Sequence, residues 1–206
     1  MSGHHAAASP GTFGADAGSA AGYVLAGGKS SRMGSNKALL PLNGGVLVQH
    51  VALQVQLATG VVTIVGPSQP FTELGFRVVE DRFPDCGPLG GIHAALLDSG
   101  AEWSLVVACD LPNVTAEFLL RLIGLARKSG ADAVMPMGPG GLPEPLCAVY
   151  RRAALDGVNR ALESGRYKVT DAFVANRTEL VAVEDMNLMA NANTPQEWRR
   201  ILEKSA

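Results

Sequence analysis

Residues 103–110 read Trp-Ser-Leu-Val-Val-Ala-Cys-Asp, and this run is the strongest indication of a strand in the chain. A nearly continuous apolar run of this length is typical of a strand that is covered on both faces, as the strands of a parallel sheet are. Residues 61–65, Val-Val-Thr-Ile-Val, have the same character and are rich in β-branched side chains. Both runs therefore predict buried strands of a largely parallel sheet.

Short apolar runs alternate with helical patterns along the rest of the chain. Several residues mark the expected ends and starts of helices. Gly60 ends one helical pattern, Thr115 caps another, and residues 194–197 form a Thr-Pro-Gln-Glu capping box. We expect strands at 22–26, 61–65, 76–79, 103–109, 133–137, 144–150 and 178–183, and helices at 46–59, 91–99, 115–128, 151–164 and from 195 onward. The alternation predicts a three-layer, Rossmann-like α/β fold, with a mostly parallel twisted sheet between two layers of helices. In such folds, ligands bind at the carboxyl ends of the strands.

The composition excludes several classes of protein. The chain has 206 residues, 47% of them hydrophobic, and a net charge of −2. It lacks an apolar run of about 18 residues, so no membrane span is expected, and its weakly acidic balance argues against nucleic acid as a partner. Three cysteines with no paired spacing fit a cytoplasmic protein better than a disulfide or zinc framework. We expect a disordered leader at 1–21 and a single domain at 22–206.

The loop after the first strand is rich in glycine and positive charge. Residues 25–37 read Leu-Ala-Gly-Gly-Lys-Ser-Ser-Arg-Met-Gly-Ser-Asn-Lys, and over residues 17–72 the only charged side chains are Lys29, Arg32 and Lys37. Paired glycines let backbone N–H groups approach a ligand, and cationic side chains pair with phosphate oxygens. The spacing is neither that of a P-loop nor that of the dinucleotide fingerprint. The loop predicts a triphosphate site, or otherwise a plain glycine-rich turn with a solvated basic face.

Carboxylates and amides follow the later strands. Asp81 lies just beyond one expected strand, and Asp110 directly follows the run at 103–109. Either aspartate can simply cap the next turn, but Mg²⁺ prefers one or two carboxylates together with phosphate oxygens and water. Asp110 is therefore the candidate magnesium ligand. Asn191 and Asn193, for which the following helix start has no structural need, are candidates to bind a substrate or to complete the metal shell.

Taken together, these motifs resemble those of a known family. The segment at 25–37, the Gly-Pro-Leu-Gly-Gly run at 87–91, Cys-Asp-Leu-Pro at 109–112, the Pro-Leu-Cys-Ala-Val-Tyr run at 145–150 and Asn-Ala-Asn-Thr-Pro at 191–195 occur in the family's order. They are similar to motifs of the molybdenum cofactor guanylyltransferases, which have the nucleotide-diphosphosugar transferase fold. The resemblance covers residues 23–204.

The resemblance implies a role for each motif. It implies that the guanine and ribose of GTP are lined by Leu25, Ala26 and Gly27, and that the triphosphate is held by Gly28, Arg32 and Lys37. It also implies that Asp81 contacts the nucleoside and that Gly91 lets the base approach a helix start. Asp110 is implied to bind Mg²⁺. Arg32, Lys37 and Asp110 are then the expected catalytic residues. The chain departs from the family pattern at Asn36, where aspartate is usual, at residues 65–67, where an asparagine often contacts the nucleotide, and at Cys147, where histidine is frequent.

The expected activity is transfer of GMP from GTP to the phosphate of molybdenum-loaded molybdopterin, giving molybdopterin guanine dinucleotide and pyrophosphate. The resemblance implies GTP and molybdopterin as partners, with transient contacts to molybdenum-inserting and acceptor molybdoenzymes. One alternative is a CTP-dependent cytidylyltransferase for the same pterin, which often has Ala-Ala-Gly where residues 26–28 are Ala-Gly-Gly. Others are a sugar-phosphate nucleotidylyltransferase, whose chains run longer, and a non-catalytic nucleotide-binding relative, against which the presence of Arg32, Lys37 and Asp110 argues.

Overall fold

The computed structural model describes residues 20–27, 36–83, 85–173, 177–192 and 194–205. They form a seven-stranded sheet with the strand order β5-β4-β1-β6-β8-β7-β9. Its strands are β1 (Ala20–Leu25), β4 (Val62–Val65), β5 (Arg77–Val79), β6 (Trp103–Ala108), β7 (Ala133–Pro136), β8 (Cys147–Arg151) and β9 (Thr178–Val181). Neighbouring strands are parallel, except that β8 is antiparallel to both β6 and β7. The prediction of a mostly parallel sheet is confirmed.

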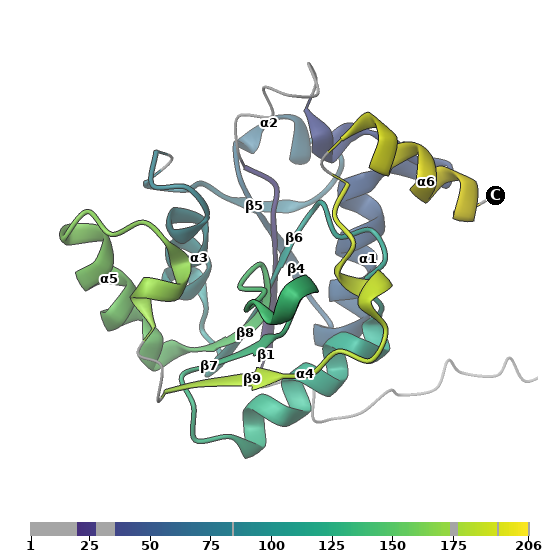
Figure 1. Ribbon diagram of the computed structural model, residues 1–206. Coiled ribbons are helices and arrows are strands. Elements are labelled where there is room, and N and C mark those ends of the chain that lie inside the picture. Colours follow the sequence, from purple (N-terminus) through teal and green to yellow (C-terminus); the bar gives the residue numbers. More distant parts are fainter. Residues whose placement is uncertain (1–19, 28–35, 84, 174–176, 193, 206) are drawn as a thin grey trace, which may run out of the picture.

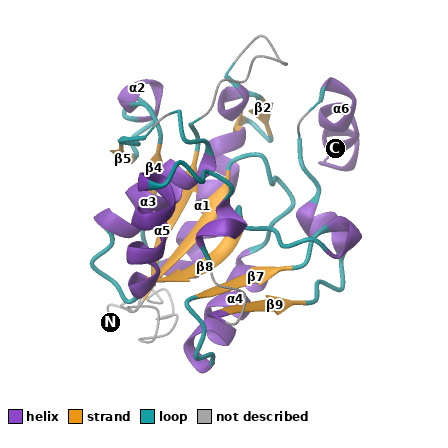
Figure 2. Cartoon of the chain, turned by 60° about the vertical axis from the view of Figure 1, so that its left-hand side comes forward, coloured by secondary structure: helices purple, strands orange, loops and turns teal. Residues whose placement is uncertain are grey.

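Helices cover both faces of the sheet. The helices are α1 (Leu47–Thr59), α2 (Ser68–Phe71), α3 (Pro88–Asp98), α4 (Ala116–Lys128), α5 (Leu155–Glu163) and α6 (Pro195–Ser205). One hydrophobic cluster joins the sheet to α1, α4 and α6, and a second joins its other face to α3 and α5 (Figure 1). Figure 2 brings α3 and α5 forward, with α1 and α4 behind the sheet. The expected three-layer α/β architecture is confirmed.

The central position of β6 explains its apolar sequence. All six of its residues are buried. Leu105 and Val107 belong to the cluster under α1 and α4, whereas Val106 belongs to the cluster under α3 and α5. Because alternate side chains of a strand point to opposite faces, a strand covered on both sides is apolar at nearly every position, and the buried polar exception in β6 is Ser104. The chain that leaves β6 carries Asp110 to the edge of the sheet.

The structure contains a small hairpin that the sequence analysis did not predict. It pairs β2 (Pro41–Leu42) with β3 (Gly45–Val46) and leads directly into α1. The two-residue loop between them is Asn43-Gly44, with positive φ angles of 49° and 79°. Positive φ at both positions is the geometry of a type I′ turn, for which Asn-Gly is the preferred pair. The dipeptide was therefore the available signal for this hairpin.

Some expected boundaries move by a few residues. β1 begins two residues before the expected position, at Ala20, because the added residues pair with the first residues of β6. α3 begins at Pro88 instead of residue 91, since Gly87 turns the chain with a φ of 62° and proline suits the first position of a helix. The strand expected from residue 144 begins at Cys147.

The predicted helix caps are present. The Thr115 hydroxyl accepts the Phe118 N–H at 3.3 Å. Thr194 and Glu197 form the reciprocal capping box, with bonds of 2.9 and 3.2 Å. Among the helices of the described residues, none combines the length and the apolar character needed to cross a bilayer.

Candidate functional site

A cleft of about 570 Å³ crosses the carboxyl ends of β5, β4, β1 and β6. Its walls come from the segments that follow these strands, from the starts of two helical segments and from the residue before β8. The lining residues are Leu25, Ala26, Gly27, Asn36, Lys37, Ala38, Val65, Gly66, Pro67, Glu80, Asp81, Gly87, Pro88, Gly91, Ala108, Cys109, Asp110 and Leu146. The cleft therefore lies at the edge of the sheet where the topology predicts a ligand site.

An ion pair stands at the β6 end of the cleft. Lys37 Nζ lies 2.9 Å from Asp110 Oδ2, although 73 residues separate the two in the chain. The Lys37 side chain is 10% exposed and that of Asp110 is 23% exposed. A largely buried ammonium group needs an anionic partner, and Asp110 supplies one here. A polyphosphate can offer the same kind of partner to Lys37.

A short 3-10 helix, Lys37–Leu39, positions Lys37 at the cleft. The Asn36 side chain caps this turn by accepting the Ala38 N–H at 3.2 Å. The Leu40 N–H closes the turn on the Lys37 carbonyl at 3.1 Å, and Ala38 is buried beneath it. Asparagine and aspartate cap helices about equally well. The departure from the family's usual aspartate at Asn36 therefore leaves this capping role intact.

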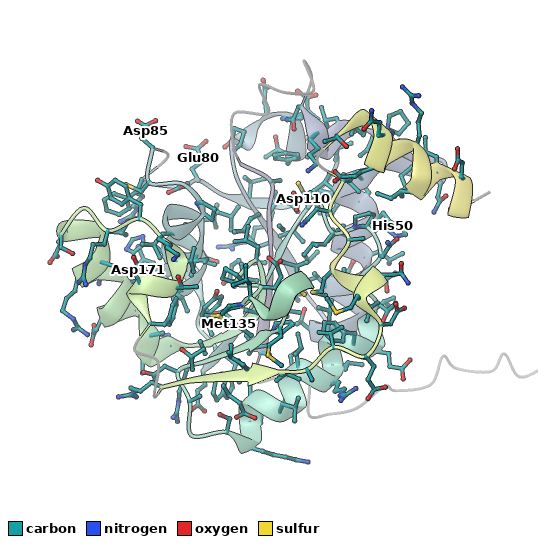
Figure 3. The ribbon with its side chains drawn as sticks, in the orientation of Figure 1. His50, Glu80, Asp85, Asp110, Met135 and Asp171 are labelled. Atoms are coloured by element: carbon teal, nitrogen blue, oxygen red, sulfur yellow. The ribbon has the colours of Figure 1, made fainter. Side chains whose placement is uncertain are left out.

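Three elements hold the loop that carries Asp110. The Cys109 N–H donates to the Leu25 carbonyl at 3.0 Å, and the Ala192 N–H donates to the Asp110 carbonyl at 2.9 Å. From α1, His50 Nε2 lies 2.9 Å from the carbonyl oxygen of Pro112, so Nε2 carries the hydrogen. These bonds fix the backbone on both sides of the carboxylate. Figure 3 shows Asp110 near the upper end of the sheet, on the side where His50 lies.

The Asp81 carboxylate is built into the start of α3. Its Oδ1 accepts the Phe83 N–H at 2.7 Å. A Cβ atom on Gly90 would lie 2.7 Å from both carboxylate oxygens, so this close approach requires glycine. Burial raises the pKa of Asp81, and the Phe83 N–H and the nearby His93 oppose that rise. The group is thus a fixed hydrogen-bond acceptor at the β5 end of the cleft.

Glycines let two backbone segments meet at the floor of the cleft. A Cβ atom on Gly66 would lie 3.2 Å from the carbonyl carbon of Ala26 and 3.3 Å from the nitrogen of Gly27. A Cβ atom on Gly91 would lie 3.2 Å from a methyl group of Leu25. The loops after β1 and β4 and the first turn of α3 consequently pack closely and leave a smooth apolar surface.

Comparison with known proteins shows the family to which the chain belongs. The sequence model of the MobA-like NTP transferase domain matches residues 22–179. The chain belongs to the MobA-like NTP transferase family. A relative from Carboxydothermus hydrogenoformans, named probable molybdenum cofactor guanylyltransferase, is 32% identical over 87% of this chain and 93% of its own length. A Mycobacterium tuberculosis protein of the same name is 35% identical over 84% of this chain and 89% of its own.

A solved structure also matches this MobA-like NTP transferase. It is the molybdopterin-guanine dinucleotide biosynthesis protein A of Archaeoglobus fulgidus, with a TM-score of 0.76 and 28% identity over 89% of this chain and 97% of that one. The resemblance to the guanylyltransferase family, inferred from the motifs, is thereby confirmed.

Most of the predicted site residues come together in this MobA-like NTP transferase. Those that line the cleft are Leu25, Ala26, Gly27, Lys37, Asp81, Gly91 and Asp110. Asn191 does not line the cleft, but its neighbour Ala192 is bonded to the Asp110 backbone. Gly28, Arg32 and Asn193 lie outside the described residues. The roles assigned to all these residues stay predictions.

The cleft of this MobA-like NTP transferase also contains residues to which the sequence analysis gave no role. Gly66, Pro67 and Glu80 line it, and so does Leu146. The rule that ligands sit at strand ends could have predicted the first three, because they directly follow β4 and β5.

Glu144 lies close enough to Asp110 for the charge of that carboxylate to add to the rise in the pKa of Glu144, which burial mainly causes. Among the described residues, no group of three or more His, Cys, Asp or Glu side chains is arranged to hold a metal.

Proposed function

We propose that the chain transfers GMP from GTP to the terminal phosphate of molybdopterin, releasing pyrophosphate. The observation that carries the proposal is the Lys37–Asp110 pair at the β6 end of a cleft whose volume of about 570 Å³ can accommodate a nucleotide. Its membership of the MobA-like NTP transferase family and the names of its relatives support the choice of GTP and of the pterin acceptor.

In the proposed reaction, an acceptor phosphate oxygen forms a bond to the α-phosphorus of GTP. The bond from the α-phosphorus to the bridging oxygen breaks, and that oxygen leaves with the electron pair as part of pyrophosphate. The attacking oxygen is already anionic, so the reaction needs no strong general base. Catalysis then consists of positioning and charge neutralisation. Lys37 neutralises charge that develops on the leaving pyrophosphate, and Arg32 is assigned the same role by the family resemblance.

The donor set at Asp110 fits Mg²⁺. One oxygen of the carboxylate faces Lys37, the side chain is partly exposed to the cleft, and a single carboxylate with phosphate oxygens and water satisfies this ion. Asp110 would hold Mg²⁺ at this position, and the ion would supply positive charge to neutralise the phosphates of GTP. The bonds that the Cys109 N–H, the Ala192 N–H and the His50 side chain donate to backbone carbonyls keep the carboxylate in place for this role.

The remaining expectations are parts of the same proposal. Asn191 and Asn193 are proposed to meet the pterin or to complete the metal shell, because the chain beside them is tied to Asp110. We also propose that residues 22–206 act as one domain, in the cytoplasm. Transient contacts with molybdenum-inserting and acceptor molybdoenzymes stay predictions.

Pyrophosphate release tests the proposal directly. The protein is supplied with molybdenum-loaded molybdopterin, Mg²⁺ and either GTP or CTP. We expect release with GTP and little with CTP. Release with CTP alone would favour the cytidylyltransferase, and nucleotide binding without any release would favour a non-catalytic relative. Both outcomes would contradict the proposed activity.

A further inference from the structure

The two ends of the cleft carry different chemical groups. Lys37 and Asp110 stand at the end of β6, whereas Glu80 and Asp81 follow β5. β4 and β1 lie between these strands, so the ends are three strand spacings, or about 14 Å, apart. Figure 3 shows Asp110 on the α1 side and Glu80 on the α3 side. An extended nucleoside triphosphate spans such a distance, and with its phosphates at Lys37 its base extends toward Glu80.

The stretch between these ends offers a base an apolar wall. Val65 ends β4, and Gly66 and Pro67 follow it; none of the three has a hydrogen-bonding side-chain group. A planar base can pack on such a surface, but its polar edge needs partners elsewhere. Among the described lining residues, the polar side chains away from the Lys37 end are Glu80 and Asp81.

Of these two carboxylates, Glu80 is bonded to Ser68 through only one of its two oxygen atoms. The Ser68 hydroxyl donates to Glu80 Oε1 at 2.6 Å, and the Ser68 N–H donates to the same oxygen at 3.3 Å. Both bonds use one oxygen, so neither occupies the lone pairs of Oε2. Asp81 is instead engaged by the Phe83 N–H and packed on α3. Ser68 therefore orients Glu80 at the edge of the cleft.

We propose that Glu80 selects guanine by accepting hydrogen bonds from its N1–H and its 2-amino group. The inference rests on the proposed function and names the residue that sets its base specificity. An ionised carboxylate only accepts hydrogen bonds. Guanine presents two adjacent donors on its Watson–Crick edge, which suit the carboxylate. Cytosine presents there one donor, its 4-amino group, beside the acceptors N3 and O2, so a carboxylate gains one hydrogen bond and is repelled by N3. Glu80 therefore favours guanine by attraction and disfavours cytosine by repulsion.

Equilibrium binding separates this role from general charge effects. Binding of GTP, ITP and CTP is measured with Mg²⁺ by calorimetry for the unaltered protein, Glu80→Gln, Ser68→Ala and Glu73→Gln. ITP lacks the 2-amino group, so the ratio of GTP to ITP affinity reports that contact. Glu73 is exposed and does not line the cleft, which makes it a control for the same loss of charge nearby. Thermal unfolding confirms that each variant is folded.

We expect the unaltered protein to bind GTP about 10-fold more tightly than ITP, and more tightly still than CTP. Glu80→Gln should weaken GTP binding about 10-fold and bring GTP and ITP within about threefold of each other, with a smaller effect for Ser68→Ala and none for Glu73→Gln. If Glu80→Gln keeps the original GTP to ITP to CTP ratios, the role of Glu80 is wrong while the proposed function stands. If the unaltered protein does not prefer GTP, the choice of base in the proposed function is wrong as well.

Discussion

Lys37→Met removes the cation beside Asp110 and keeps most of the apolar stem of the side chain. Lys37 Nζ lies 2.9 Å from Asp110 Oδ2, so a phosphate must compete with this carboxylate for the ammonium group. A charge-assisted hydrogen bond to phosphate contributes about 1.5–3 kcal/mol, and a partly exposed ion pair offsets about 1 kcal/mol or less of it. The net loss of GTP binding is then about 0.5–3 kcal/mol, which is about 2- to 150-fold in Kd.

Calorimetric titration with GTP and Mg²⁺ measures this loss. Lys37→Arg is the matched control, because it keeps the positive charge and a donor to phosphate. The affinity of the unaltered protein should also fall more steeply with added salt than that of Lys37→Met, since salt screens the contact that the variant lacks. A GTP affinity for Lys37→Met within twofold of the original would refute the assignment of Lys37 to the phosphates.

Three further changes test other parts of the site and fold. Asp110→Asn should lower the rate of pyrophosphate release about 100-fold or more while circular dichroism stays unchanged; a near-normal rate would remove Asp110 from the metal role. Gly66→Val should destabilise the protein by about 1–3 kcal/mol and weaken GTP binding, because the new side chain meets the loop after β1. The control Gly100→Ala, with no atom within 4 Å of its Cβ position, should change neither property. Equal melting temperatures for Gly66→Val and the unaltered protein would contradict the close packing at Gly66. The hydrogen bonds from Arg77 lower the pKa of Asp98. The unaltered protein should therefore be more stable than Asp98→Asn, with the full difference above the ordinary aspartate pKa of about 4 and a smaller difference as the pH falls below it. A difference in chemical unfolding that stays constant from pH 7 to pH 2 would argue against this contribution of Asp98.

The sequence was sufficient to predict the layers of the fold but not every strand direction. Apolar runs predicted the buried strands, because a covered strand must be apolar whichever way it points. The antiparallel direction of β8 depends instead on its short connection from β7, which pairs Ala133 with Tyr150. The Gly/Pro-rich turn at 138–143 was the local sign of that reversal. The two-residue strands of the β2–β3 hairpin are too short to show a periodicity of their own.

The sequence motifs indicated several residues that line the cleft, but not the contacts that those residues make. Motif residues such as Lys37, Asp81 and Asp110 meet in one cleft because the ends of parallel strands share one edge of the sheet. The bond between Lys37 and Asp110 depends on the path of two loops far apart in the chain. The contact between Ser68 and Glu80 likewise depends on how α2 folds back over the end of β5. Motifs and hydrophobic patterns do not predict the conformation of such loops.

Labelling the α- and γ-phosphates of GTP separately shows which bond of the nucleotide breaks and which group reaches the pterin. The protein is incubated with molybdenum-loaded molybdopterin, Mg²⁺ and GTP that carries radioactive phosphorus at either the α or the γ position. We expect the α label to appear in the pterin dinucleotide and the γ label in pyrophosphate, in equal amounts. Release of the γ label as inorganic phosphate, or no α label in the pterin product, would contradict the proposed transfer of GMP.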